Sequence, residues 1–249
     1  MSRAVLVTGA SRGIGRAVAQ RFSALGDRVA VHFGASRDDA ERTLRGLHGD
    51  GHTLLQADLG EGEQARHLVD DAAAALGGLD VLVNNAGVFL ASPPATSAWE
   101  HWEQTWSRTL AVNLSGSAHA TFAAVPHLAA GGGGAVVSVT SRGAFRGEPE
   151  CPAYGASKAG LNAFSQSMAV ALAPLGISVT AVAPGFVDTD MAREVLDGPA
   201  GEAVRAQSPF GRVATADEVA AAVVWLASPE ARFSSGTIVD VNGASYLRS

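Results

Sequence analysis

Short apolar runs rich in β-branched residues alternate along the chain with longer stretches in which apolar residues recur at helical spacing. The apolar runs have the length of strands, and their nearly continuous hydrophobicity is typical of strands covered by helices on both faces. They lie at residues 4–9, 28–33, 52–58, 79–87, 135–141, 177–185 and 237–243. The intervening stretches, such as 14–26 and 63–78, have the apolar stripe of helices that pack on a sheet.

This alternation predicts βαβ units and a parallel sheet, because parallel strands need a crossover connection between them. Right-handed crossovers then produce an α/β fold, a Rossmann-type doubly wound parallel sheet of about seven strands with helices on both faces. No linker or change in composition divides the chain, and the glycine run at 131–134 fits a tight turn into a strand. We therefore expect one domain spanning residues 1–249.

Composition and charge exclude several classes of protein. The chain is 47% hydrophobic and 17% charged, which predicts a sizeable core rather than disorder. A net charge of −6 without a basic stripe argues against nucleic-acid binding. No apolar stretch of about 18 residues predicts a membrane span, and the N-terminus has no signal-peptide pattern. A single cysteine, Cys151, excludes an internal disulfide, and the histidines show no metal-ligand spacing. We expect a soluble, cytoplasmic protein without a metal site.

The segment VTGASRGIG joins the first predicted strand to the first predicted helix and places glycines at positions 9, 13 and 15. Glycine permits a sharp turn and a close approach of the backbone to a ligand. The helix N-terminus that follows favours an anion such as a pyrophosphate. The alternative is a tight turn and nothing more, but the position directly after the first strand favours nucleotide binding.

The segment YGASK places Tyr154 four residues before Lys158, which is the only lysine in the chain. At this spacing on a helix the two side chains share a face, where an ammonium lowers the pKa of a phenol and makes it an acid/base group. Chance is the alternative explanation for a single lysine. Lysine nevertheless has what arginine lacks, a compact charge on a slender stem.

Five short motifs occur in order along the chain: TGASRGIG at 8–15, NNAG at 84–87, Ser141, YGASK at 154–158 and PGFVDTDM at 184–191. Together they resemble the short-chain dehydrogenase/reductase family, and within it the members similar to β-ketoacyl carrier-protein reductases. The resemblance extends from residue 4 to about residue 243. It implies an NAD(P)-binding Rossmann fold that interconverts a carbonyl and an alcohol by hydride transfer.

The resemblance also implies a catalytic set of Asn113, Ser141, Tyr154 and Lys158. Tyr154 is the acid/base, Ser141 orients the substrate carbonyl, and Lys158 holds the nicotinamide ribose while it tunes the phenol. Asn113 marks a local helix kink that holds a water in a proton relay. From the residues alone, Ser141 is equally a turn serine at a strand end, and Asn113 an exposed helix position.

The cofactor-binding residues implied by the resemblance follow the ends of the predicted strands. They are Gly9, Ser11, Arg12, Gly13, Ile14, Gly15, Phe33, Ser36, Arg37, Asp58, Leu59, Asn84, Asn85, Ala86, Gly87, Tyr154, Lys158, Pro184, Gly185, Val187 and Thr189. NAD-preferring relatives have an acid after the second strand, where this chain has Phe33. Arg12 and Arg37 offer guanidinium groups to a 2′-phosphate, unless Arg37 is simply a solvated helix charge. NADP(H) is therefore the expected cofactor, with NAD(H) as the alternative.

The substrate is expected to be a small-molecule carbonyl or alcohol, and residues 188–210 resemble a mobile lid over it. A β-ketoacyl group on an acidic carrier protein is the alternative, weakened because the segments 128–134 and 172–178 carry no charge to attract such a partner. The loop between Ser141 and Tyr154 carries two arginines and two glutamates, Arg142, Arg146, Glu148 and Glu150, which we interpret as solvated and mutually paired. A small ketone, a sugar-like polyol and a secondary metabolite all fit.

The helix expected to begin near Pro152 is rich in small residues. In the family such a helix pairs across a dimer axis, so the resemblance implies a homotetramer with closed symmetry. Trp99, Trp102 and Trp106 fall at helical spacing, which is typical of core or subunit packing. A non-catalytic, nucleotide-sensing member of the family is the remaining alternative, and the complete catalytic set argues against it.

Overall fold

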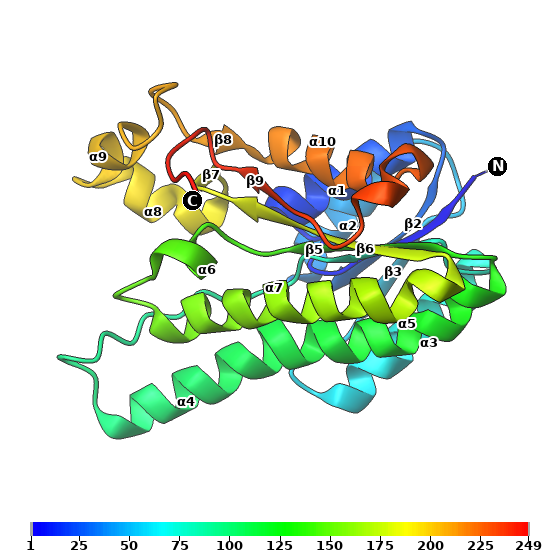
Figure 1. Ribbon diagram of the computed structural model, residues 1–249, viewed down its shortest axis with the longest axis horizontal. Helices are drawn as coiled ribbons and strands as arrows, with labels where there is room; N and C mark the ends of the chain where they lie inside the picture. Colours follow the sequence, from blue (N-terminus) through cyan, green and yellow to red (C-terminus); the bar gives the residue numbers. More distant parts are fainter. Residues whose placement is uncertain (1, 249) are drawn as a thin grey trace.

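The computed structural model describes residues 2–248, without the side chains of Met191 and Glu194. Its centre is a seven-stranded, all-parallel sheet with the strand order β3-β2-β1-β4-β5-β6-β9 (Figure 1). The strands are β1 (Ala4–Val7), β2 (Arg28–Phe33), β3 (Thr53–Gln56), β4 (Val81–Asn84), β5 (Gly134–Val139), β6 (Ile177–Pro184) and β9 (Ile238–Val241). All seven predicted strands are present, and the Rossmann-type doubly wound sheet is confirmed.

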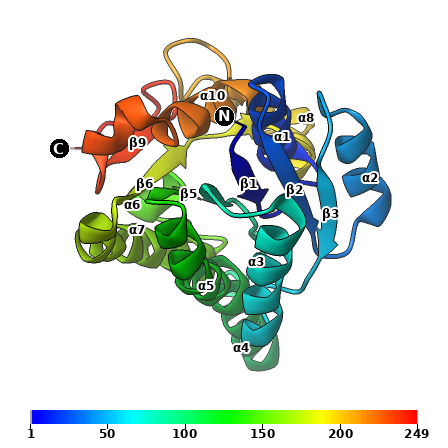
Figure 2. The same cartoon turned by 90° about the vertical axis from the view of Figure 1, so that its right-hand side faces the viewer.

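Helices cover both faces of the sheet (Figure 2). One face is covered by α1 (Gly13–Ala24), α2 (Arg37–Arg45) and α10 (Ala216–Leu226). The other is covered by α3 (Gly62–Leu76), α5 (Ser117–Ala130) and α7 (Pro152–Leu172), and α4 (Trp99–Leu110) packs against α7. Single 3-10 turns follow α7 at Ala173–Leu175 and α10 at Pro229–Ser234.

The strands are hydrophobic without interruption because each face of the sheet has its own apolar layer. In β1, Leu6 belongs to the layer under α3 and α5, whereas Val5 and Val7 belong to the layer under α1 and α10. Successive strand residues point to opposite faces, so a strand buried on both needs an apolar residue at every position. All four residues of β1 are at most 1% exposed.

Three local features depart from the regular alternation. A π-helical turn, Ala111–Gly116, joins α4 to α5 and contains Asn113, so the irregularity expected at this residue is present. Short helices α6 (Gly143–Arg146), α8 (Asp190–Asp197) and α9 (Gly201–Arg205) lie in the connections that follow β5 and β6. A two-stranded parallel pair, β7 (Val187–Asp188) with β8 (Ala214–Thr215), was not predicted, since two-residue strands leave no hydrophobic pattern.

No helix among residues 2–248 is long and apolar enough to cross a membrane.

Candidate active site

A cleft of about 480 Å³ lies along the carboxyl ends of the strands, where ligands bind in doubly wound sheets. It extends from Ser36 and Asp58, after β2 and β3, to Tyr154 and Lys158 on α7. Most predicted cofactor residues line it: Gly9, Ser11, Arg12, Gly13, Ile14, Gly15, Ser36, Asp58, Leu59, Asn85, Ala86, Gly87, Tyr154, Lys158, Pro184, Gly185, Val187 and Thr189. The tertiary structure thus brings together residues from five strand ends and one helix.

The glycine loop after β1 leaves no room for side chains. Gly9 and Gly13 have φ of 64° and 55°, a region that favours glycine. A Cβ on Gly15 would overlap the Gly9 carbonyl oxygen and lie 2.5 Å from Asn85 Nδ2. No side chain caps the N-terminus of α1, which follows directly. This cradle of backbone and free helix N–H groups fits a pyrophosphate.

His32, at the end of β2, holds this loop in place, and the sequence analysis missed it. Its Nδ1 accepts a hydrogen bond from the Gly9 amide at 3.0 Å, and its Nε2 lies 3.1 Å from the Ala57 carbonyl oxygen, to which it donates. Burial lowers the pKa of His32 to about 4, so the ring is neutral at neutral pH. The only signal was a polar residue inside the otherwise apolar run RVAVHF.

Three predicted cofactor residues do not line the cleft. Phe33 is 1% exposed and belongs to the core under α1, because its position in the pleat points it to that face. The Arg37 guanidinium lies 5.2 Å above the Phe33 ring and pairs with Glu41, so it is directed along α2. Asn84 is buried and donates to Thr121, whereas its neighbour Asn85 faces the glycine loop and donates to the Thr8 carbonyl. The structure therefore places these three residues outside the lining of the cleft.

A salt bridge between Asp58, which follows β3, and Arg108 lies at the rim of the cleft. Arg108, on α4, donates to Asp58 Oδ2 at 2.9 Å, and this bond holds the pKa of Asp58 below its usual range. Both residues line the cleft, and Arg108 was not predicted. The position of Arg108 on a predicted helix did not indicate that its side chain contacts a residue at the end of β3.

Ser141, Tyr154 and Lys158 meet at the other end of the cleft. A hydrogen bond joins the hydroxyl groups of Ser141 and Tyr154, and Lys158 Nζ lies 5.7 Å from the centre of the Tyr154 ring. Lys158 is 3% exposed and donates to the Val139 carbonyl oxygen at 2.8 Å. A guanidinium is planar and broader than this buried ammonium.

The electrostatics of this group differ from the sequence-based expectation of a lowered phenol pKa. Burial raises the pKa of Tyr154 to about 12, and the hydrogen bond from Ser141 opposes the rise. Burial also lowers the pKa of Lys158 to about 8. Loss of hydration therefore outweighs the hydrogen bond from Ser141, and Tyr154 carries its proton at neutral pH.

Asn113 lies behind the catalytic group and is fully buried, so the interpretation as an exposed helix position is wrong. Its side chain bonds to both backbone groups of Val88 at 2.8 and 3.0 Å, and its Nδ2 donates to Ser157 Oγ at 3.1 Å. These bonds fasten the π-helical turn to α7 and to the segment after β4.

The loop between Ser141 and Tyr154 is not mutually paired. Arg142 donates to Ser245 Oγ at 2.6 Å and lies 5.4 Å above the Phe186 ring, while Arg146 donates to Gln207. Within residues 2–248, no ion pair joins either arginine to Glu148 or Glu150. Glu148 instead lines the cleft beside Tyr154.

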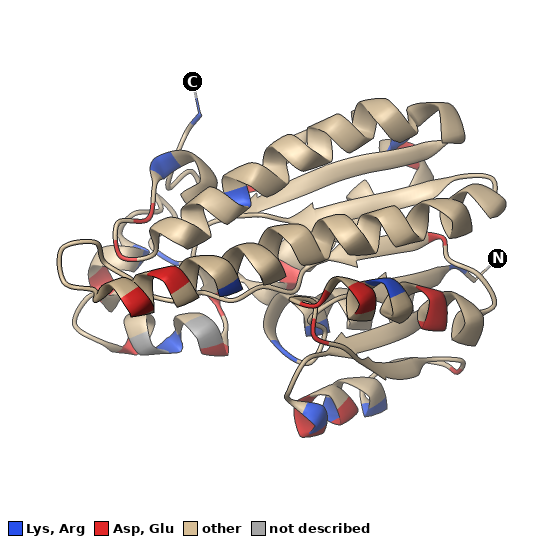
Figure 3. Ribbon diagram, turned by 90° about the horizontal axis from the view of Figure 1, so that it is seen from below, with Lys and Arg blue, Asp and Glu red and all other residues tan. Residues whose placement is uncertain are grey.

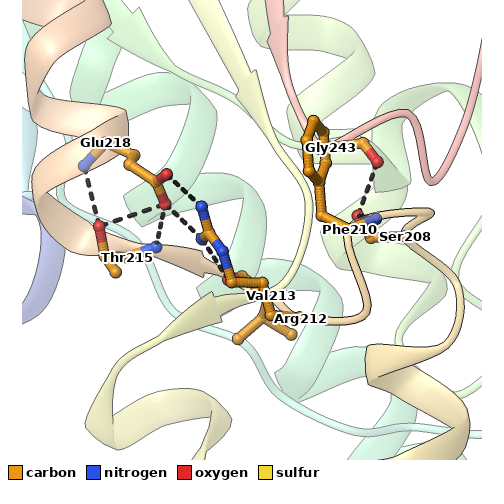
Figure 4. Close-up of polar contacts among 7 residues, drawn as sticks. All are labelled: Ser208, Phe210, Arg212, Val213, Thr215, Glu218 and Gly243. Atoms are coloured by element: carbon orange, nitrogen blue, oxygen red, sulfur yellow. Dashed lines mark hydrogen bonds and ion pairs between the residues drawn. The ribbon is translucent and has the colours of Figure 1, made fainter.

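The segment expected to act as a lid contains α8 and α9, and Asp190, Ala192 and Val195 of α8 line the cleft. The chain after α9 is fastened at two points (Figure 4). Ser208 Oγ donates to the Gly243 carbonyl at 2.7 Å, and Glu218 caps α10 reciprocally with Thr215 while it pairs with Arg212. The two short helices thus lie between β7 and a fixed return segment.

Comparison with known proteins agrees with this geometry. Residues 9–244 match the family model described as enoyl-(acyl carrier protein) reductase. The chain is 32% identical over 249 residues to the 3-oxoacyl-(acyl-carrier-protein) reductase FabG of Staphylococcus epidermidis, covering 99% of this chain and 100% of that protein. It is 38% identical over 243 residues to the granaticin polyketide synthase putative ketoacyl reductase 2 of Streptomyces violaceoruber, covering 97% and 95%.

A solved structure is similar over nearly the whole chain. It is a short chain dehydrogenase from Burkholderia cenocepacia in complex with NADP, with a TM-score of 0.88 and 37% sequence identity. The match covers 98% of this chain and 97% of that one.

Proposed function

Since this chain belongs to the short-chain dehydrogenase/reductase family of oxidoreductases, we propose that it interconverts a carbonyl and a secondary alcohol with NADP(H). The observation that carries the proposal is the meeting of Ser141, Tyr154 and Lys158 at one end of a cleft whose other end is a pyrophosphate cradle. A nicotinamide bound between them supplies or accepts the hydride.

The residues of the chain then perform the proton chemistry. The Ser141 hydroxyl donates to the substrate carbonyl oxygen and places it beside the phenol. Tyr154 donates its proton to that oxygen as the alcohol forms. At neutral pH the phenol holds the proton that this step needs.

Lys158 and Asn113 position this group. The Lys158 ammonium, directed by the Val139 carbonyl, lies against Tyr154 where it stabilises negative charge on the phenol oxygen after proton transfer. Asn113 fixes the π-helical turn behind it. The predicted water relay at Asn113 remains part of the proposal.

The preference for NADP(H) rests on charge at the cradle. Arg12 lines the cleft with its side chain exposed, and no ion pair engages it within residues 2–248. The end of β2 offers no acid to a ribose diol, since the first acid after His32 is Asp38. The similar Burkholderia structure in complex with NADP supports the same choice.

Two measurements test the proposed function. Fluorescence titration should show tight binding of NADPH and weak binding of NADH. Tyr154→Phe should lower ketone reduction by about a hundred- to ten-thousandfold while NADPH binding persists, because only the proton donor is removed. Turnover that survives in Tyr154→Phe would refute the assigned role, and binding of neither nucleotide would refute the function.

Reduction of a β-ketoacyl group on a carrier protein is a second candidate, favoured by the ketoacyl reductases among the relatives. It predicts that acetoacetyl thioesters of acyl carrier protein are reduced far faster than the corresponding thioester of a short pantetheine analogue. Equal rates would exclude recognition of the carrier.

We also propose that the protein is a homotetramer, built in part through α5 and α7. Apart from Lys158, these helices carry no Lys, Arg, Asp or Glu, and the long helices on this side show few coloured segments in Figure 3. Phe122 on α5 and Val170 on α7 are 75% and 79% exposed, which leaves apolar surface for a second copy.

Light scattering of the wild-type protein should give the mass of four chains. Val170→Asp should lower that mass, because it introduces a charge into the apolar contact. Leu25→Asp changes an equally apolar exposed residue at the end of α1 and should leave the mass unchanged. A wild-type protein at the mass of one chain would contradict the proposal.

A further inference from the structure

Glu148 is an unpaired carboxylate at the substrate end of the cleft. It is partly buried and lines the cleft together with Ser141 and Tyr154. No described residue donates a hydrogen bond to its carboxylate or forms an ion pair with it. The other two acids that line the cleft, Asp58 and Asp190, have Arg108 and Arg193 as partners. Partly buried carboxylates are usually paired, because removing them from water is costly.

The loop holds Glu148 in this position from both sides. The Glu148 carbonyl accepts a hydrogen bond from the Cys151 amide at 3.0 Å, at the start of α7 and three residues before Tyr154. On the other side, the Glu148 side chain lies against the backbone of Gly143. A Cβ on Gly143 would overlap its Oε1 and lie 2.7 Å from its Cγ.

The neighbouring arginines do not neutralise the carboxylate. Arg142 is bonded to Ser245 and Arg146 to Gln207, on segments outside the loop. Their charges act on Glu148 only at longer range, and burial raises its pKa despite them. Among the described residues, the Glu148 carboxylate therefore has no partner, and the residue lines the cleft.

Apolar side chains also line this cleft. The Phe89 ring meets the Tyr154 ring edge-on with centroids 4.8 Å apart, and Phe186 and Val195 are among the other lining residues. A substrate held here has an apolar body in contact with these side chains. It also needs one hydrogen-bond donor that reaches Glu148.

We propose that Glu148 is a specificity residue whose carboxylate accepts a hydrogen bond from a hydroxyl or ammonium group close to the substrate carbonyl. This inference rests on the proposed carbonyl reduction and narrows its substrate class to hydroxy or amino ketones with an apolar body. A simple acyl or alkyl ketone leaves the carboxylate desolvated and unpaired, and it is selected against for that reason.

Three ketones of similar shape test the proposal: 2-hydroxyacetophenone, 2-aminoacetophenone and propiophenone. They differ only in the group attached to the carbon atom next to the carbonyl, which is a hydroxyl, an ammonium or a methyl group respectively. The wild-type enzyme should reduce at least one of the first two with a kcat/KM about ten- to a hundredfold higher than that for propiophenone. The preferred member identifies the donor as a hydroxyl or an ammonium.

Glu148→Leu should abolish that preference by lowering kcat/KM for the preferred ketone and raising it for propiophenone. Glu148→Gln keeps the shape and one acceptor, so the preference should fall to an intermediate value. Glu150→Gln is the matched control, since it removes the same charge from an exposed position of the same loop and should leave the preference intact. NADPH titration of each variant verifies that it is folded.

The outcomes separate this inference from the function on which it rests. A wild-type enzyme that binds NADPH and reduces propiophenone as well as the other two ketones overturns the role of Glu148 and leaves carbonyl reduction standing. An unchanged preference in Glu148→Leu or Glu148→Gln also overturns it. Failure to reduce any ketone of a wider panel would count against the proposed function itself.

Discussion

The two ends of the cleft are built in different ways. The cofactor end is made mostly of backbone: a glycine loop, a helix N-terminus and strand ends that are rigid because β1, β2 and β4 are neighbours in the centre of the sheet. The substrate end is made of side chains from connections, with Phe89 after β4, Glu148 after β5, and Phe186 and Val195 after β6. A backbone site tolerates little change, whereas a site of loop side chains can change its ligand without changing the fold.

Gly15→Ala should have the largest effect, because it adds a Cβ atom to the cofactor end of the cleft, which is built mostly of backbone. The new Cβ would overlap the Gly9 carbonyl oxygen and crowd Asn85 and Ala10, so the loop must move. We expect a loss of about 1–3 kcal/mol of stability and of measurable NADPH binding. Thermal unfolding and fluorescence titration measure the two effects. Gly46→Ala is the control, since its Cβ meets nothing closer than 3.5 Å, and an equal loss in that variant would show that the effect is not specific.

The hydrogen bonds of His32 should make the cofactor end sensitive to acid. The folded-state pKa of about 4 lies below the ordinary histidine value of 6.5, so the unfolded chain takes up a proton first as the pH falls. Stability should therefore decrease between about pH 6.5 and pH 4, by up to about 3 kcal/mol. Denaturant unfolding across this range should show a shallower pH dependence in His32→Asn. An identical dependence in both proteins would assign the effect to other groups.

Lys158→Arg should distinguish the effect of side-chain charge from that of side-chain shape, at the point where the two ends of the cleft meet. The guanidinium keeps the charge but is broader than the buried ammonium beside Val139, so we expect kcat to fall by about a hundredfold. Steady-state kinetics with NADPH measure this fall. Unimpaired turnover would show that the single lysine of the chain is at this position by chance.

The smallest expected effects come from the two arginines proposed at the cofactor phosphate. Arg12 lines the cleft, whereas Arg37 lies over Phe33 and pairs with Glu41. Arg12→Ala should weaken NADPH binding by about tenfold, and Arg37→Ala by less, with NADH binding unchanged in both. The reverse order would mean that Arg37 turns from α2 toward the cleft when the cofactor binds.

Sequence alone determined the sheet, the glycine loop and the shared helix face of Tyr154 and Lys158. Each of these follows from a short local pattern: continuous hydrophobicity for strands buried on both faces, glycines where a Cβ would clash, and an i, i+4 pair on a helix. Ser141 and Asn113 were found only through the resemblance to a family, since nothing in the neighbours of Asn113 predicts a π-helical turn.

The tertiary structure decided what these patterns could not. His32 and Arg108 act through contacts with residues 23 or more positions away, and Glu148 is distinguished by the lack of a partner among the described residues. The departures of Phe33 and Asn84 from the cleft follow from their burial in the folded sheet. The direction of the Tyr154 pKa likewise depends on burial, which adjacent residues do not reveal. Local sequence specifies backbone conformation and periodicity, but hydration and long-range partners exist only once the chain has folded.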